Sequence, residues 1–145
     1  AGPAQYEKIK NELKEKYAIE IDNIENVSIV PYIYNMEEIM NIVDLVVSRS
    51  GAMTITEIAN VGVPAIFIPF PFATENHQEY NAKVLKNVGA AKIILDKNLT
   101  ANELNSTITN LVKEPQILQE MAKKANTVAI QNVEEKIYNE IKEVI

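Results

Sequence analysis

Short apolar runs alternate with amphipathic segments along this chain. Four runs have the length of a strand and are apolar nearly throughout, namely Val27–Ile33, Asp44–Ser48, Ala65–Phe70 and Ala91–Leu95. Strands that are buried on both faces read as continuous apolar runs, whereas half-exposed strands alternate with polar residues. The pattern therefore predicts an α/β fold, with a Rossmann-like parallel sheet flanked by helices.

Apolar residues at helical spacing predict the segments that connect these strands. The predicted helices are Pro3–Tyr17, Asn35–Val43, Ala52–Gly62, His77–Gly89, Ala101–Lys113, a helix beginning at Pro115, and Asn132–Ile145. Asn35 is a candidate N-cap, and Thr100 with Glu103 forms a capping-box pattern. Gly62 is expected to close its helix. No linker or repeat divides the chain, so residues 1–145 are predicted to form a single domain.

The composition and net charge of the chain argue against several classes of function. The chain has 145 residues, of which 47% are hydrophobic, enough for one packed core. A net charge of −6 argues against nucleic acid as the partner, and the absence of Cys excludes a disulfide framework or a cysteine zinc site. The longest apolar stretch, Pro64–Ala73, is too short to span a membrane. The chain begins with Ala1 and shows no apolar leader, so we expect a processed or excised fragment.

The stretch SRSGAMTITE runs from the end of a predicted strand into a predicted helix. A helix start offers free N–H groups to a phosphate, and Gly51 permits close backbone approach. Arg49 adds positive charge, while Ser50 and Thr54 offer hydroxyls. Glu57 shares a helix face with Thr54 and is placed to accept two ribose hydroxyls. The alternative, a capped helix with a solvated Glu57 and a surface Arg49, is equally compatible with the spacing.

A second candidate follows the third apolar run, in the loop PFPFATENHQ. His77 and Gln78 stand at a helix start, where they offer polar side chains to a ligand at the sheet edge. His77 is the only His, and with only Glu75 and Glu79 nearby a metal site is not expected. In the alternative interpretation, His77 and Gln78 simply cap the helix.

A third candidate lies where the first apolar run leaves the sheet. Ile33 and Met36 could form an apolar slot for a flat base, with backbone amides reading its edge. On the residues alone, core packing is the favoured interpretation of both side chains. No Ser-His-Asp arrangement and no positioned pair of carboxylates is readable, so we predict ligand-holding residues and no catalytic residue in this chain.

Together these residues resemble a known family. The segment Asp44–Ala82 is similar to the donor-binding, C-terminal half of the MurG family of bacterial peptidoglycan N-acetylglucosaminyltransferases. The match is dense over about a third of the chain. The matching motifs are Ser48–Glu57, Gly62–Pro64, Pro69–Pro71, His77–Ala82 and Gly89–Ala91.

The resemblance implies the GT-B fold, in which two Rossmann-like halves face each other across the active site. It implies binding of UDP-N-acetylglucosamine as a substrate, with no cofactor and no metal. The sugar would be transferred with inversion to undecaprenyl-pyrophosphoryl-MurNAc-pentapeptide, by a cytoplasmic enzyme held on the inner face of the cell membrane.

The resemblance also implies roles for individual residues. The Ile33 backbone would read the uracil and Met36 would line the nucleotide pocket. Glu57 would hold the ribose hydroxyls, and His77 with Gln78 would face the sugar. The residues near the diphosphate would be Arg49, Ser50, Gly51 and Thr54.

Two departures from the family pattern shape the expectation. Family members carry an N-terminal half that faces the lipid-linked acceptor, and a Gly-rich loop opens their C-terminal half. Neither is recognisable here, so we expect the chain to lack the first strand and helix of its own half. We expect it to be inactive without an N-terminal half, supplied in cis or in trans. Two alternatives stay open: a GT-B transferase for another nucleotide sugar or acceptor, and a non-catalytic nucleotide-sugar-binding subunit. The upstream reading frame would separate a fragment from a split enzyme.

Overall fold

A computed structural model describes residues 2–20, 24–130 and 132–144. The chain divides into two compact units, residues 1–38 and residues 39–145, and each is described by itself. The division falls within helix α2, Met36–Ile42.

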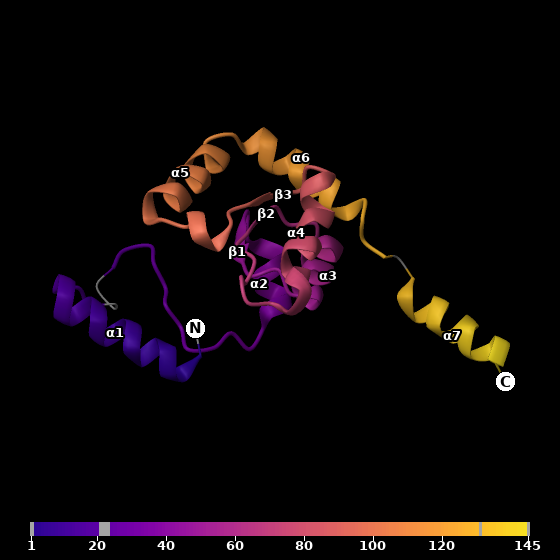
Figure 1. Cartoon of the computed structure of the whole chain (residues 1–145), viewed down its shortest axis with the longest axis horizontal. Coiled ribbons are helices and arrows are strands. Elements are labelled where there is room, and N and C mark those ends of the chain that lie inside the picture. Colours follow the sequence, from indigo (N-terminus) through magenta and orange to yellow (C-terminus); the bar gives the residue numbers. More distant parts are fainter. Residues whose placement is uncertain (1, 21–23, 131, 145) are drawn as a thin grey trace. The chain divides into compact units, whose positions relative to one another are not determined.

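The second unit contains a three-stranded parallel sheet in the order β1-β2-β3 (Figure 1). Its strands are β1, Val46–Ser48, β2, Ala65–Phe67, and β3, Ala91–Ile93. In the register of the sheet, Val46 lies beside Ala65, and Ala65 lies beside Ala91. The predictions of a parallel sheet and of these three strands are confirmed. The strands run in the same direction, so the segments that follow them all leave from one edge.

Proline limits the length of β2. The predicted strand ran to Phe70, but the observed strand ends at Phe67. The Ile68 N–H still donates to the Ser48 carbonyl at 2.9 Å. Pro69 then has no N–H to continue the ladder, and Pro71 follows two residues later.

Besides the strands, the second unit contains helices and short 3₁₀ turns with the following bounds. They are α3, Ala52–Val61, the 3₁₀ turn η2, Thr74–Asn76, α4, His77–Asn87, η3, Asp96–Asn98, α5, Ala101–Val112, α6, Pro115–Asn126, and α7, Val133–Val144. Two predicted terminal signals are confirmed. The Thr100 hydroxyl accepts a hydrogen bond from the Glu103 N–H at 3.1 Å, and Gly62 closes α3 at φ 77°.

Alternate residues of β2 point to opposite faces of the sheet, and each face has its own core. One core joins Ala65 and Phe67 of β2 to buried residues of α3 and α4, chiefly Ile58 and Leu85. The other joins Ile66 and Ile68 to Ile94, to Leu111 of α5 and to Met121 of α6. Every β2 residue is buried, as expected for a strand covered on both sides.

The first unit consists of helix α1, Pro3–Tyr17, and an extended segment. Helix α1 has the predicted bounds. The predicted strand Val27–Ile33 is wrong, because these residues form no strand in the structure. Val27, Val30 and Tyr32 are exposed, and the Pro31 carbonyl accepts a hydrogen bond from the Gly2 N–H at 2.9 Å. An apolar run becomes a strand only where a neighbouring strand pairs with it, and Pro31 lacks the N–H that such a ladder requires.

Candidate functional site

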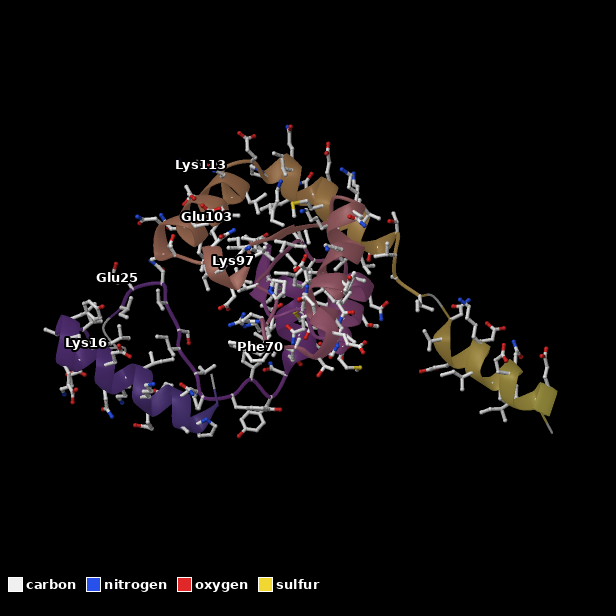
Figure 2. The ribbon with its side chains drawn as sticks, viewed as in Figure 1. Lys16, Glu25, Phe70, Lys97, Glu103 and Lys113 are labelled. Carbon is white, nitrogen blue, oxygen red and sulfur yellow. The ribbon has the colours of Figure 1, made fainter. Side chains whose placement is uncertain are left out.

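The segments that follow β1, β2 and β3 meet at the carboxyl edge of the sheet. Open α/β sheets bind ligands at this edge, beyond the ends of their strands. Figure 2 labels Phe70 on the loop after β2 and Lys97 on the segment after β3. The residues predicted for the phosphate and the sugar, 49–57 and 77–78, belong to this edge and to the two helices that begin there.

Ser50 and Gln78 link the starts of these two helices. Ser50 is fully buried, and its hydroxyl donates to the Gln78 backbone carbonyl at 2.7 Å. The Ser50 N–H donates to the Gln78 side-chain oxygen at 3.3 Å. Asn81 completes the link, since its amide nitrogen donates to the Ser50 carbonyl at 3.2 Å. The Ser50 side chain therefore holds α3 against α4 and does not reach solvent.

The side-chain amide of Gln78 has a fixed orientation. Its oxygen accepts from both the Ser50 N–H and the Phe70 N–H, the latter at 3.0 Å. Two N–H donors require the oxygen on that side, so the NH₂ group must face away from them. No described residue pairs with that nitrogen, and no buried side-chain nitrogen or oxygen among the described residues lacks a partner. The NH₂ group is therefore not fully buried, and it has two hydrogens to donate.

Arg49 is held by the segments that follow β2 and β3. Its Nη1 donates to the carbonyls of Ile68 and Pro69, each at 3.1 Å, and to the Asp96 carboxylate at 2.6 Å. Its guanidinium carbon also lies 5.7 Å from the centre of the Phe70 ring. Arg49 thus ties the ends of all three strands together. Asp96 was not among the site residues predicted from the sequence. Asp96 comes shortly after β3 and Arg49 comes directly after β1, and the ends of parallel strands lie at the same edge of the sheet.

The start of α3 is open to a ligand. Gly51 is its N-cap and has no side chain, and no other side chain caps the first turn. The first N–H groups of a helix have no partner within the helix. Gly51 has an ordinary φ of −62°, and a Cβ there would meet nothing nearer than the Thr54 hydroxyl at 3.8 Å. The fold itself does not require glycine at this position. Glu57 is exposed on the same helix and Thr54 is half-buried.

The loop between β2 and α4 carries His77 at its end. Glu75 and Asn76 both have left-handed φ values, 50° and 57°, which is unusual for residues other than glycine. This pair of residues turns the chain sharply into α4. His77 is exposed at the first position of α4. The Phe70 and Phe72 rings meet edge to face, with centroids 5.7 Å apart, and Phe72 is among the most exposed apolar side chains.

A cleft of about 300 Å³ separates this loop from the segment after β3. Its lining residues are Pro69, Pro71, Asn76, Glu79, Leu95, Asp96 and Lys97. A hydrogen bond from the Asn76 amide, followed by one from Lys83, holds the pKa of Glu79 below its ordinary value. Glu79 in turn raises the pKa of Lys83. The Glu79 carboxylate in this wall is therefore charged near neutral pH, and each of its oxygens contacts Asn76 or Lys83.

Ile33 and Met36 lie in the first unit. Ile33 is half-buried and Met36 is exposed at the first position of α2. Their assignment to a base-binding slot stays a prediction. Among the described residues, no group of three or more His, Cys, Asp or Glu side chains is arranged to hold a metal ion. Within the same part of the chain, no helix has the length and apolar character needed to cross a membrane.

Residues 1–137 match the glycosyltransferase family 28 C-terminal domain. The chain belongs to this family. Two relatives are named UDP-N-acetylglucosamine--N-acetylmuramyl-(pentapeptide) pyrophosphoryl-undecaprenol N-acetylglucosamine transferase. The relative from Acetivibrio thermocellus is 42% identical over 144 residues, and the alignment covers 99% of this chain and 37% of the relative. The relative from Thermoanaerobacter sp. is 42% identical over 143 residues, covering 99% and 38%.

A solved structure agrees with this family assignment. The crystal structure of Acinetobacter baumannii MurG matches with a TM-score of 0.84 and 36% identity, over 99% of this chain and 40% of that protein. The resemblance to MurG and the prediction of a GT-B donor-half fold are confirmed. The chain spans well under half the length of the relatives that it matches.

Proposed function

We propose that this chain is the donor-binding domain of a glycosyltransferase that uses UDP-N-acetylglucosamine. The acceptor would be undecaprenyl-pyrophosphoryl-MurNAc-pentapeptide, and the product a peptidoglycan precursor. The observation that carries the proposal is the family match over residues 1–137, together with 42% identity to enzymes named for this reaction. The open start of α3 at the sheet edge supplies a physical site for the donor diphosphate.

The diphosphate would lie at the start of α3. The free N–H groups and the positive end of the helix dipole favour an anion there, and the Thr54 hydroxyl adds a donor. Gly51 leaves the space in which a phosphate approaches the backbone. This arrangement stabilises the charge that develops on the leaving diphosphate, so we propose that no cofactor is needed. Arg49 and Ser50, which the sequence placed beside the phosphate, would instead support the site through the contacts described above.

The remaining parts of the donor would meet other side chains. Glu57 is exposed one turn after the helix start, where its carboxylate would accept the two ribose hydroxyls. His77 and the free NH₂ group of Gln78 would donate to the sugar. Ile33 and Met36 would hold the uracil.

The transfer itself needs groups that this chain does not supply. Inverting transfer requires a base within hydrogen-bond reach of the acceptor hydroxyl, and an acceptor held in line with the anomeric carbon. We propose that an N-terminal half provides both, in cis or in trans, and that it brings the lipid-linked acceptor. The complete enzyme would then work in the cytoplasm on the inner face of the cell membrane. The alternative proposal is a different nucleotide sugar or acceptor on the same scaffold.

A transfer assay tests this division of labour. Radiolabelled UDP-N-acetylglucosamine is mixed with a lipid-linked MurNAc-pentapeptide and with the chain alone. In a second reaction the chain is fused to the N-terminal half of the Acetivibrio thermocellus relative. We expect product only from the fusion. Turnover by the chain alone would contradict the division of labour. A fusion that transfers sugar only from another nucleotide sugar would support the alternative donor.

A further inference from the structure

The contacts of Arg49 fix one end of the loop that leads to the sugar-facing residues His77 and Gln78 at the start of α4. The guanidinium donates hydrogen bonds to the carbonyls of Ile68 and Pro69, the last residues before this loop. The other end is fixed at Gln78, whose side-chain oxygen accepts from the Phe70 N–H. The loop, residues 70–76, is therefore held at both ends by hydrogen bonds to its backbone.

Asp96 determines where the guanidinium lies. The Asp96 carboxylate is the only charged partner of Arg49 among the described residues, at 2.6 Å, and it projects from the segment after β3. The bond to the Asp96 carboxylate joins two charged groups, so it is shorter and stronger than the bonds from the same guanidinium to the neutral carbonyls. The Arg49 and Asp96 side chains are 48% and 35% exposed, so solvent screens the pair and its effect on overall stability is small. Its geometric effect is larger, because a long and partly exposed arginine has many rotamers without an anchor.

We propose that Asp96 is a positioning residue for the sugar end of the nucleotide-sugar donor. This inference rests on the proposed function. Asp96 orients Arg49, Arg49 holds the Ile68 and Pro69 carbonyls, and the fixed loop keeps Phe70 bonded to Gln78. The free NH₂ group of Gln78 then faces the sugar. Asp96 does not touch the donor itself.

The effect should be confined to the sugar. The start of α3 is set by its own backbone and by the buried Ser50, which bonds to the Gln78 main chain independently of Asp96. The diphosphate and ribose contacts on α3 would therefore survive the loss of Asp96. The Gln78 amide keeps its bond from the Ser50 N–H and loses only the shorter bond from the Phe70 N–H, so the direction of this amide is what the loop affects.

The test compares Asp96→Asn with the matched control Asp44→Asn. Asp44 is an exposed aspartate just before β1, so the control makes the same chemical change away from the loop. Calorimetry gives the affinity of each chain for UDP and for UDP-N-acetylglucosamine. We expect Asp96→Asn to lower the affinity for the nucleotide sugar about fivefold and to leave that for UDP unchanged, as befits a partly exposed charge pair. Asp44→Asn should change neither affinity, and Asp96→Glu should recover part of the loss.

Hydrogen exchange provides a readout without ligand. The Phe70 amide is protected by the Gln78 oxygen, so its exchange should become roughly fivefold faster in Asp96→Asn and stay unchanged in Asp44→Asn. Equal loss of UDP and nucleotide-sugar affinity, or an Asp96→Asn variant with the wild-type affinity ratio, would overturn the inference while the proposed function stands. A wild-type chain that binds neither ligand would overturn the proposed function and the sugar subsite with it.

Discussion

The Ser50 hydroxyl donates to the Gln78 backbone carbonyl at 2.7 Å, and this bond joins the starts of α3 and α4. Ser50 is the buried polar residue of the core at this edge. The bond crosses from the segment after β1 to the first turn of α4, so it fixes the spacing of the two helix starts between which the donor would sit.

Replacing Ser50 with alanine should lower the stability of the protein. Ser50→Ala removes the hydrogen bond from the buried Ser50 hydroxyl to the Gln78 carbonyl, which costs about 0.5–1.5 kcal/mol in the free energy of unfolding. Urea denaturation followed by circular dichroism measures this change. Ser106→Ala is the control, because Ser106 bonds the Glu103 carbonyl on an exposed surface of α5. Equal small losses in the two variants would contradict the structural role of Ser50.

Gly51→Ala should separate binding from folding. A Cβ at position 51 fits the folded chain, and the small loss of N-cap quality opposes the small gain from a stiffer unfolded chain. We expect the free energy of unfolding to change by less than about 1 kcal/mol. The same Cβ would occupy the approach of a phosphate, so affinity for UDP should fall at least about tenfold. Unchanged UDP affinity would show that the phosphate lies elsewhere.

Glu57→Ala tests the ribose contact. If the carboxylate accepts two hydroxyls, its loss should cost about 1.5–3 kcal/mol of UDP binding free energy, with little change in melting temperature. Wild-type protein should bind 2′-deoxy-UDP more weakly than UDP, and the variant should bind both equally. Glu120→Ala on α6 is the matched control, since Glu120 is likewise exposed on a helix. A variant that still prefers UDP over its 2′-deoxy form would contradict the assignment.

Glu79 makes a pH-dependent contribution to stability. The hydrogen bond from Asn76, and then that from Lys83, lowers the folded-state pKa of Glu79 below its ordinary value of 4.5. A lowered folded-state pKa stabilises the protein above pH 4.5, and that contribution is lost as the pH falls through the folded-state value. The stability gap between wild type and Glu79→Gln should therefore shrink on acidification. Thermal melts across a pH series measure this gap, and a gap that widens in acid would contradict the linkage.

The sequence predicted the elements of the second unit because local signals and burial agree there. Pro115, Thr100 and Gly62 mark helix ends by backbone chemistry that needs no tertiary context. The same logic failed for Val27–Ile33, since an apolar run records burial without specifying a pairing partner. Helices could thus be predicted from capping residues and proline, whereas a strand also depends on a pairing partner that the local sequence does not specify.

The side chains of the site show a similar division. Their position at the carboxyl edge followed from the strand order. Their protein partners did not, because spacing does not show that the Ser50 hydroxyl bonds to the Gln78 carbonyl or that Arg49 bonds to the Ile68 carbonyl. Residue spacing predicts that a polar side chain lies at the sheet edge. Only the folded structure shows whether that side chain already bonds to a neighbouring backbone group.

Nucleotide selectivity is the most direct measurement of the central claim, that this chain holds the donor of a UDP-sugar transferase. Calorimetric titration of the wild-type chain with UDP, ADP and GDP compares ligands that share the diphosphate and the ribose and differ only in the base. The account predicts that UDP binds more tightly than ADP and GDP. Equal binding of the three nucleotides, or no binding of any, would contradict it.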